Sequence, residues 1–511
     1  MPRVYATTTA WGELLPQDAH NAALLANAHP ADWANPQPAA RYDLVVIGAG
    51  TAGLTAAADA TSLGVKVALV ERHLLGGNTV SLGSVPSKCL IAAARIAACI
   101  HAAPAFGVRA GAPEIDFAAV MERARRLRAR ISQRSALQRF KELGADVFLG
   151  NARFTAPDRV EVGDKTLRFQ RAIVATGARP VHPPIDGLAE AGFLTNETVF
   201  SLTERPSRLA VVGGGPVGCE LAQAFHRLGS AVTIVETGSQ LLPREDRDAA
   251  VLLTAVFKRD GVAVRLNTRP KRVEVSDAQK LLHLERGSTQ ETLAADDILV
   301  GVGRAPNAEG LGLEAAGIRH SFHGIHTNDY LQTTNPNIYA AGDVCTPWGY
   351  THTAEASARI VIQNALLHGR KKLSALTLPW CTHTDPEIVH VGITVQDAAT
   401  RGIALETFLI YLRDVDRAIV EGQEDGFVKI HVKKGTDCIL GATIVARHAG
   451  EMINEITLAM VARIGLGKLA GVIHPYPTQA EAIRKAAEVY KRTRPTPLGK
   501  RLVERWLRWA R

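Results

Sequence analysis

Cysteine is scarce in this sequence, and none of its six copies forms a C-x-x-C pair or a metal-ligand spacing. The six are scattered along the chain, which excludes a disulfide scaffold and favours a reducing cytoplasm. The sequence also lacks a charged segment followed by an apolar run at its start, and no uninterrupted apolar stretch approaches about 20 residues. We therefore expect a cytoplasmic protein with no signal peptide, no membrane span and no bound metal.

An excess of charge of one sign is confined to the end of the chain. The 511 residues carry a net charge of +9, and positions 491–511, with eight basic residues and one glutamate, account for +7 of it. The body is therefore nearly neutral, and its charge does not indicate nucleic acid binding. The composition, 46% apolar and 21% charged, is that of a globular protein, and the length predicts about three domains.

The basic tail, positions 495–511, has the pattern of an amphipathic helix. Its apolar residues can line one side and its lysine and arginine residues the rest. Such a helix can lie on an anionic membrane surface, and packing on the body or on a partner subunit explains it equally simply. The apolar residues are Leu498, Leu502, Val503, Trp506 and Leu507.

A glycine-rich turn follows the first predicted strand, in VVIGAGTAGLTAA. The G-x-G-x-x-G pattern lies between a strand and a helix, where the backbone can approach a pyrophosphate and the helix N-terminus can attract it. The next strand ends in Glu71, at the distance expected for a ribose-binding acid. The pattern predicts a dinucleotide site at Gly48, Gly50, Gly53 and Glu71.

The same arrangement recurs in LAVVGGGPVGCELAQAF, and its following strand ends in Glu236. An acid there accepts hydrogen bonds from a ribose 2′-hydroxyl and repels a 2′-phosphate, which predicts NADH rather than NADPH. The alternative is that Glu236 is a solvated strand end and that Arg244 or Arg247 binds the phosphate. The glycines of this second turn are Gly213, Gly215 and Gly218.

With both turns in view, positions 42–490 resemble the pyridine nucleotide–disulfide oxidoreductase family, and most of all its mercuric reductase-like and dihydrolipoamide dehydrogenase-like members. Three further segments carry the resemblance: IVATGARP, VGVGRAPN and IYAAGDV. The resemblance implies two cofactors, a tightly held FAD and an exchanging nicotinamide nucleotide. It also implies further cofactor-binding residues: Gly77, Ala175, Thr176, Gly177, Gly303, Arg304, Gly342 and Asp343.

The implied fold is α/β, with two Rossmann-like dinucleotide-binding domains, one for FAD and one for NAD, and a C-terminal α+β dimerisation domain. The family therefore predicts a homodimer. The expected segments are an N-terminal extension at 1–41, an FAD domain at 42–190 and 306–371, an NAD(P) domain at 191–305, a dimerisation domain at 372–490 and the tail at 491–511.

The sequence departs from the family at the active-site disulfide, where members carry G-G-x-C-x4-C-x-P-S-K. Thr79 and Ser84 stand at the two cysteine positions. A hydroxyl has no redox chemistry, so no reducible disulfide can form there. Cys89 follows the motif's lysine and points about 100° away from it on a helix, so it cannot replace Ser84. We interpret Cys89 as a packed cysteine, and a sensor thiol is the alternative.

A second departure lies near the C-terminus, where the family's His-Pro-Thr-x-x-Glu becomes Tyr476-Pro-Thr-x-x-Glu481. A phenol is a poor proton shuttle at neutral pH, and His474 lies two residues upstream. Whether Tyr476 or His474 transfers protons stays open. No cysteine follows Cys438, so the C-terminal cysteine pair of mercuric reductases is missing as well.

The residues implied for flavin reduction are intact. Lys88 matches the family lysine near the flavin, and Glu220 matches the glutamate that pairs with it beside the nicotinamide. We therefore expect an oxidoreductase that takes hydride from NADH onto FAD and reduces a small acceptor, such as a quinone, without a disulfide relay. The alternatives are a transhydrogenase, a mercuric reductase-like metal or thiol reductase, and a silent FAD-binding sensor. The residues expected to be catalytic are Lys88, Glu220, Tyr476 and Glu481.

Overall fold

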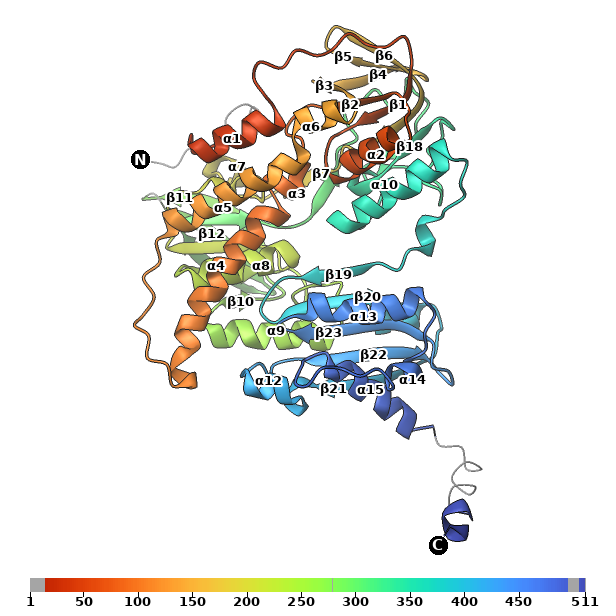
Figure 1. Cartoon of the computed structure of the whole chain (residues 1–511). Helices are drawn as coiled ribbons and strands as arrows, with labels where there is room; N and C mark the ends of the chain where they lie inside the picture. The colour runs from red at the N-terminus through yellow and green to blue at the C-terminus, as the bar shows by residue number, and fades with distance from the viewer. Residues whose placement is uncertain (1–13, 278, 495–504, 511) are drawn as a thin grey trace. The chain divides into compact units, whose positions relative to one another are not determined.

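The computed structural model describes residues 14–277, 279–494 and 505–510 (Figure 1). The chain packs into two compact units, here called unit 1 (Met1–Ser239 and Gly261–Leu376) and unit 2 (Gln240–Asp260 and Thr377–Arg511). Both glycine-rich turns lie in unit 1. Of the predicted tail, positions 495–504 and 511 lie outside the described residues, and the three-domain division stays a prediction.

The first sheet of unit 1 is built around β1 (Tyr42–Ile47), whose apolar run Leu44–Ile47 is buried on both faces, as expected of a central parallel strand. β1 pairs in parallel with β2 (Val67–Glu71) and β6 (Lys165–Val174), which places Val46 opposite Leu69 and Ile173. The strand order is β3-β2-β1-β6-β5-β4, and β18 also pairs with β6. The other strands are β3 (Asp146–Leu149), β4 (Ala152–Ala156), β5 (Arg159–Val162) and β18 (Ile338–Ala340).

Small side chains let two helices approach one another closely beside this sheet. α2 (Thr51–Ser62) lies along α10 (Thr351–Leu366), and Ala56, Ala57 and Ala358 are fully buried in the shared core (Figure 1). Both helices begin at the edge where the parallel strands end. We call the part of unit 1 built on this sheet its first half. Its remaining helices are α3 (Gly77–Ser81), α4 (Ser84–Ala102), η1 (Ala103–Phe106), α5 (Phe117–Ser132), η2 (Gln133–Ser135) and α6 (Leu137–Glu142).

The N-terminal extension packs against this half of unit 1. It contains the helix α1 (Ala19–Ala28), and the Asp18 side chain caps this helix by accepting a 2.8 Å hydrogen bond from the Asn21 amide. Farther along, Trp33 donates to the Val147 carbonyl, and Asn35 bonds both the N–H and the C=O of Leu149. Because β3 is an edge strand, the extension covers hydrogen-bonding groups that the sheet leaves open.

The second half of unit 1 repeats the parallel arrangement with fewer strands. Its four strands follow the order β10-β9-β8-β14, and α8 (Pro216–Arg227) follows β8 directly. The four are β8 (Arg208–Val212), β9 (Ala231–Val235), β10 (Ala263–Arg265) and β14 (Asp297–Val300). Smaller elements are β7 (Ala178–Pro180), β11 (Arg269–Ser276), β12 (Gln279–Arg286), β13 (Thr289–Ala295), β15 (Arg304–Pro306), β16 (His320–Ser321), β17 (Gly324–Ile325), α7 (Leu188–Ala191), η3 (Val199–Ser201), η4 (Gly342–Val344) and η5 (Leu373–Ala375).

Unit 2 contains one antiparallel sheet in the order β19-β20-β23-β22-β21. The strands are β19 (Pro379–Thr382), β20 (Glu387–Gly392), β21 (Leu405–Tyr411), β22 (Phe427–Lys433) and β23 (Ile439–Ala446). The helices are α9 (Arg247–Asp260), α11 (Val395–Thr400), η6 (Leu412–Asp414), α12 (Asp416–Val420), α13 (Ala449–Val461), α14 (Leu466–Leu469) and α15 (Glu481–Arg492).

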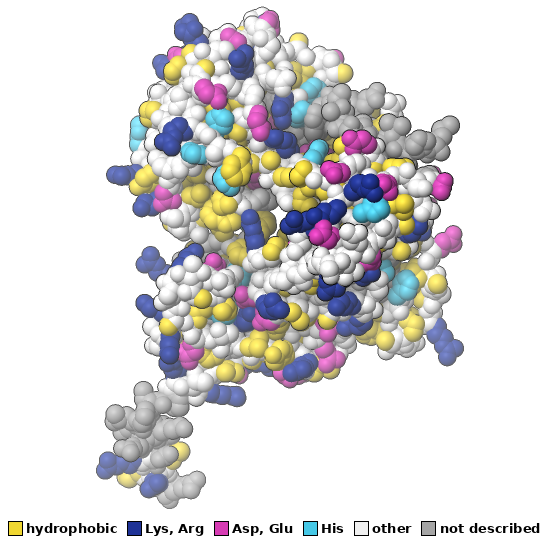
Figure 2. Space-filling view, turned by 180° about the vertical axis from the view of Figure 1, so that it is seen from behind, with side chains coloured by type: hydrophobic (Ala, Val, Ile, Leu, Met, Phe, Trp, Pro, Cys, Tyr) yellow, Lys and Arg dark blue, Asp and Glu magenta, His cyan; other side chains and the backbone are white. Residues whose placement is uncertain are grey.

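Acidic and basic side chains are intermixed on the face that Figure 2 shows, as the near-neutral charge of the body predicts. By length and composition alone, the helical run Gly77–Phe106 could cross a membrane. One such helix is weak evidence for a span, and this one carries Lys88, whose ammonium group contacts a glutamate of α8. The absence of a membrane span stays a prediction.

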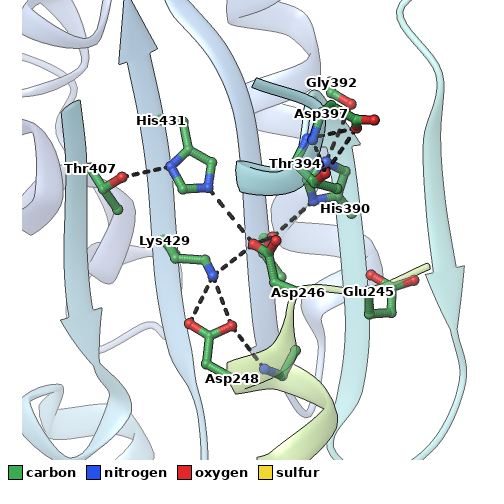
Figure 3. Close-up of polar contacts among 12 residues, drawn as sticks. Glu245, Asp246, Asp248, His390, Gly392, Thr394, Asp397, Thr407, Lys429 and His431 are labelled. Atoms are coloured by element: carbon green, nitrogen blue, oxygen red, sulfur yellow. Dashed lines mark hydrogen bonds and ion pairs between the residues drawn. The ribbon is translucent and has the colours of Figure 1, made fainter. Parts of the chain in front are cut away.

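A buried polar cluster joins α9 to the sheet of unit 2 (Figure 3). Lys429, only 5% exposed, places its ammonium 2.7 Å from carboxylate oxygens of both Asp246 and Asp248. Burial alone would raise the pKa of Asp246, but the neighbouring His431 and Lys429 side chains hold it well below its usual range. Burial lowers the pKa of His390 to about 4, so this imidazole is neutral at physiological pH.

Glu245 lies next to this cluster and behaves in the opposite way. One of its carboxylate oxygens accepts a 2.6 Å hydrogen bond from the Trp380 indole, and the other has no hydrogen-bond partner among the described residues. Burial, helped by the neighbouring Asp246 carboxylate and opposed by the Trp380 bond, raises the pKa of Glu245 to about 7.

We expect Glu245 to make unit 2 less stable as the pH rises. The native side chain keeps its proton up to about pH 7, whereas the unfolded chain releases it near the ordinary pKa of 4.5. The stabilisation is therefore complete below pH 4.5 and is lost as the pH rises from 4.5 to about 7. Glu245→Gln keeps the acceptor for Trp380 but has no proton to lose. Between pH 4.5 and pH 7, the wild type should therefore lose about 3 kcal/mol of its free energy of unfolding relative to Glu245→Gln.

Urea unfolding at a series of pH values measures this difference. The exposed Glu424→Gln variant is the matched control and should follow the wild-type profile. A wild-type profile parallel to that of Glu245→Gln would contradict the assignment.

Candidate nucleotide-binding and redox site

The first glycine-rich turn joins β1 to α2 and leaves no room for side chains. A Cβ on Gly48, whose φ is +99°, would lie 2.4 Å from the Ala175 carbonyl oxygen, and one on Gly53 would lie 1.7 Å from the Gly48 oxygen. Gly77, at the start of α3, faces the same turn: its φ is +56°, and a Cβ there would lie 2.8 Å from the Gly50 Cα. The turn is therefore bare backbone that a pyrophosphate can approach.

The second turn has the same construction between β8 and α8. A Cβ on Gly213 would lie 2.6 Å from the Gly301 carbonyl oxygen, and one on Gly218 would lie 2.0 Å from the Gly213 oxygen. Gly215 is the N-cap of α8, as Gly50 is the N-cap of α2. Two helix N-termini in unit 1 are thus open to anionic groups.

Each turn is fixed by the acid that ends the second strand. Glu71 accepts hydrogen bonds from the amides of Ala49 (2.6 Å) and His73 (2.7 Å). Glu236 accepts in the same way from Gly214 and Gly238, both at 2.6 Å. A carboxylate has about four acceptor positions, so each acid retains capacity for a ribose hydroxyl.

The predicted ATG and APN segments meet, although they are far apart in the sequence. The Thr176 hydroxyl donates to the Asn307 carbonyl at 2.7 Å, and the Asn307 side chain donates back to the Thr176 carbonyl at 2.9 Å. Gly177 also accepts a hydrogen bond from the Asn307 amide. These contacts connect the ends of β6 and β15.

Arg304 and Asp343, both expected at the cofactor, face one another. The Arg304 guanidinium lies 3.8 Å from an Asp343 oxygen and also donates to the Ala178 carbonyl. Burial raises the pKa of Asp343, against the opposing charge of Arg304. Gly303 directly precedes β15, and Gly342 opens η4, where its amide donates to the Ser357 hydroxyl.

Lys88 and Glu220, the two residues expected to assist hydride transfer, are in direct contact. The Lys88 ammonium lies 2.6 Å from a Glu220 carboxylate oxygen, joining α4 to α8. The Glu220 side chain is 8% exposed and that of Lys88 is 37% exposed. The carboxylate is therefore buried, whereas solvent or a ligand can reach the ammonium group. Sequence analysis predicted this contact, and the structure confirms it.

Three threonine hydroxyls meet where the resemblance places a family cysteine. Thr79 on α3 lies 3.0 Å from the hydroxyls of both Thr51 and Thr351. Thr51 and Thr351 are the first residues of α2 and α10, so three helix starts converge here. Sequence analysis named Thr79 but missed its contact with Thr351, which lies 272 positions away. Ser84, at the start of α4, is exposed.

Side chains from other elements hold the segment between α3 and α4. Asn78 donates to the Ala178 carbonyl at 2.9 Å, and Asn196 donates to the Leu82 carbonyl at 3.2 Å. Arg128, 2% exposed, donates to the Ser81 carbonyl at 2.9 Å and to the Asn21 side chain of the N-terminal extension at 2.6 Å. The extension therefore supports the segment that carries Thr79.

All six cysteines are described, and none forms a disulfide. Burial raises the pKa of the thiols of Cys89, Cys219 and Cys345, so these groups stay protonated at neutral pH. Cys89 is partly buried, in keeping with its interpretation as a packed residue.

The expected C-terminal proton-transfer residues lie in unit 2. The Tyr476 phenol donates to Asp416 at 3.0 Å, and this bond together with the Asp416 charge raises the phenol pKa. Glu481 pairs with Arg484 at 2.6 Å. The His474 side chain is only 7% exposed and lies 3.0 Å from Glu455. A catalytic role for Tyr476 and Glu481 stays a prediction.

Comparison with known proteins accounts for both units. Residues 42–358 match the model of the pyridine nucleotide–disulphide oxidoreductase family, and residues 378–487 match that family's dimerisation domain. The chain belongs to this family. Its members are oxidoreductases that act on NAD(P)H with FAD, and the dimerisation domain indicates a homodimer.

The similar proteins include a mercuric reductase and a dihydrolipoyl dehydrogenase. Mercuric reductase from Staphylococcus aureus is 34% identical over 87% of this chain and 82% of its own length. Dihydrolipoyl dehydrogenase from Thermus scotoductus is 35% identical over 88% of this chain and 97% of its own.

Solved structures show the same fold. LpdA from Mycobacterium tuberculosis matches with a TM-score of 0.80 at 29% identity, covering 88% of this chain and 99% of its own. The HOCl-induced flavoprotein disulfide reductase RclA from Escherichia coli matches with a TM-score of 0.78 at 28% identity, covering 87% of this chain and 99% of its own.

The residues of unit 1 fit FAD. The Gly50–Gly77 approach provides a bare turn for the pyrophosphate, Glu71 suits the ribose, and Asp343 lies at the second flavin motif. The Thr353 hydroxyl, in the first turn of α10, is fully buried and has no hydrogen-bond partner among the described residues. A buried hydroxyl of this kind is costly unless a ligand completes it.

We expect Gly77→Ala to weaken FAD binding by at least about tenfold, because a methyl group 2.8 Å from the Gly50 Cα must displace the turn. Gly107→Ala is the matched control: Gly107 also has a positive φ (+77°), but nothing lies within 4 Å of its Cβ position. FAD titration of the apoprotein, followed by fluorescence quenching, measures both. Equal FAD affinity in the two variants would show that the turn does not bind the cofactor.

Proposed function

We propose that this protein is an NADH-dependent FAD oxidoreductase that reduces a small acceptor directly, with quinones as the first candidates, and that it uses no disulfide relay. The observation that carries this proposal is the Lys88–Glu220 contact at 2.6 Å in the presence of a hydroxyl, Thr79, at the relay position. Bound FAD would supply the two-electron chemistry between nicotinamide and acceptor.

The residues of the chain would orient and polarise the reactants. Glu220 fixes the position of the Lys88 ammonium, and the ammonium stabilises negative charge that develops near it. Because Glu220 is buried, this interaction is weakly screened by solvent. The pair therefore supports entry of electrons from a nicotinamide nucleotide.

Glu236 supports NADH as that nucleotide. Its carboxylate is held by two backbone amides at the end of β9, where a 2′-phosphate would meet a fixed negative charge. Arg265, at the end of the neighbouring strand β10, is paired with Glu291 at 3.2 Å.

The state of the thiols supports direct oxidation of the reduced flavin by the acceptor. Cys89, Cys219 and Cys345 are kept protonated by burial, and Thr79 cannot be oxidised to a disulfide. The electrons must then leave to a molecule that reaches the flavin itself. A lipid or soluble quinone accepts two electrons and two protons in such a step, which makes it the first class to test.

We expect anaerobic NADH to bleach the flavin absorbance within seconds and NADPH to do so at least about tenfold more slowly. Stopped-flow mixing measures both rates, and a soluble quinone should then restore the oxidised spectrum. Cys89→Ser should leave this turnover unchanged. Equal bleaching by the two nucleotides would instead favour a transhydrogenase, and no bleaching by either would favour a silent FAD-binding protein.

We expect Glu220→Gln to slow flavin bleaching by NADH about 100-fold while changing the Kd for NADH less than about threefold, because it removes a charge that acts on the reacting groups. Glu161→Gln, on the exposed face of β5, is the matched control and should retain the wild-type rate. Single-turnover kinetics separate the two parameters. An unchanged bleaching rate in Glu220→Gln would remove the pair from the mechanism.

A further inference from the structure

A β-hairpin in unit 2 brings together three side chains that can bind a metal ion. Cys381 lies on β19, Glu387 opens β20, and His383 lies in the connection between them. One donor atom of each lies within 4.8 Å of the other two. Sequence analysis missed this group, because C-x-H-x3-E is not a familiar ligand spacing and only the hairpin turns it into a cluster.

The position of each donor is fixed by the fold. Cys381 pairs with Val389 in the antiparallel register and packs against the core of unit 2. Glu387 is 7% exposed and accepts a 3.0 Å hydrogen bond from the Gly450 amide in the first turn of α13 through one oxygen. Its other oxygen lies 3.7 Å from His383 Nδ1.

Both neighbours of His383 approach the same ring nitrogen. Cys381 Sγ lies 3.8 Å from Nδ1, and Glu387 Oε1 lies 3.7 Å from that same atom. A nucleophile–base–acid relay needs its two contacts on opposite nitrogens of the imidazole, so this arrangement cannot be one. Three lone-pair donors that converge on one point are instead the arrangement of a metal site.

Two of the three separations, sulfur to nitrogen and nitrogen to oxygen, are close to those of tetrahedral coordination, and the third lies within 4.8 Å. Zn–S bonds of about 2.3 Å and Zn–N bonds of about 2.1 Å place sulfur and nitrogen about 3.6 Å apart around one ion, and nitrogen and oxygen about 3.4 Å apart. The observed 3.8 Å and 3.7 Å exceed these values by a few tenths of an ångström, which small side-chain rotations remove. The carboxylate keeps its hydrogen bond to Gly450 through its second oxygen, as metal-bound carboxylates generally do.

We propose that Cys381, His383 and Glu387 form a binding site for one borderline divalent transition-metal ion of the zinc class in each subunit. The ligands are one thiolate, one imidazole and one carboxylate, a set that suits Zn2+ and excludes Mg2+ and Ca2+, which prefer oxygen alone. The His383 side chain is 37% exposed, so solvent can reach the group and supply the fourth ligand. The site is independent of the nucleotide-binding residues of unit 1.

The test uses the purified FAD-loaded protein, stripped with a chelator and titrated with Co2+ and then Zn2+. Tetrahedral cobalt with a thiolate ligand has d–d bands at longer wavelengths than the absorbance of oxidised flavin, so these bands can be read in the intact holoprotein. We expect one cobalt per subunit in the wild type, displaced by zinc. Cys381→Ser should abolish the thiolate band, and His383→Gln should weaken zinc binding by more than the roughly 10–100-fold typical of outer-shell changes.

Matched controls separate a built site from chance binding. Cys438→Ser removes an exposed thiol of the same unit and should leave stoichiometry and affinity unchanged. Flavin content and the melting temperature of the metal-free proteins show whether each variant folds, and His383→Gln, at a half-exposed position, provides the test if Cys381→Ser does not. Absence of a cobalt–thiolate band in the wild type, or equal zinc binding by His383→Gln and the wild type, would overturn the proposal.

Discussion

The ion pair between Lys88 and Glu220 is the contact on which the proposed function depends. It joins α4, in the first half of unit 1, to α8, which follows the first strand of the second half. Burying a glutamate costs several kcal/mol of desolvation, which a partner at 2.6 Å offsets without a large net gain in stability. Such a pair is better explained by the position it gives the ammonium than by the stability it contributes.

The rest of unit 1 contains two turns of the same construction, each of which fits a nucleotide. Each nucleotide half ends a buried strand in a bare glycine turn, begins a helix there, and fixes the turn with an acid from the next strand. Glu71 and Glu236 make equivalent pairs of backbone contacts, so the two halves of unit 1 fix their glycine turns in the same way. The duplication explains why both turns could be recognised from spacing alone, since each depends on residues within about 25 positions of one another.

The local elements and the family motifs were predictable because their causes are local. The apolar runs of β1 and β20–β23, the glycine turns and the start of α10 follow from patterns within one or two elements. The contacts of Thr79 with Thr51 and Thr351, and of Arg128 with Ser81, join segments that are distant in sequence. Hydroxyls and guanidinium groups accept many partners, so residue type alone does not identify these contacts.

The same reason explains what else the sequence did not reveal. Trp33 and Asn35 cover β3 because that strand is an edge, a property of the sheet order and not of the extension itself. The Asp246–Lys429 cluster depends on α9 packing within unit 2, although α9 follows the second glycine turn in the chain. Sequence order would have assigned that helix to the nucleotide domain alone.

With a hydroxyl in place of a cysteine at position 79, the α3–α4 segment has to be held without a disulfide. A disulfide between positions 79 and 84 would close a very short loop, worth about 2 kcal/mol in the unfolded chain. Hydrogen bonds from Asn78, Asn196 and Arg128, each contributing about 1 kcal/mol, give a comparable restraint in the folded chain. The segment can therefore keep its position without a covalent link. Hydrogen bonds cannot replace a two-electron store beside the flavin, and this is why the proposed function has the acceptor react with the flavin itself.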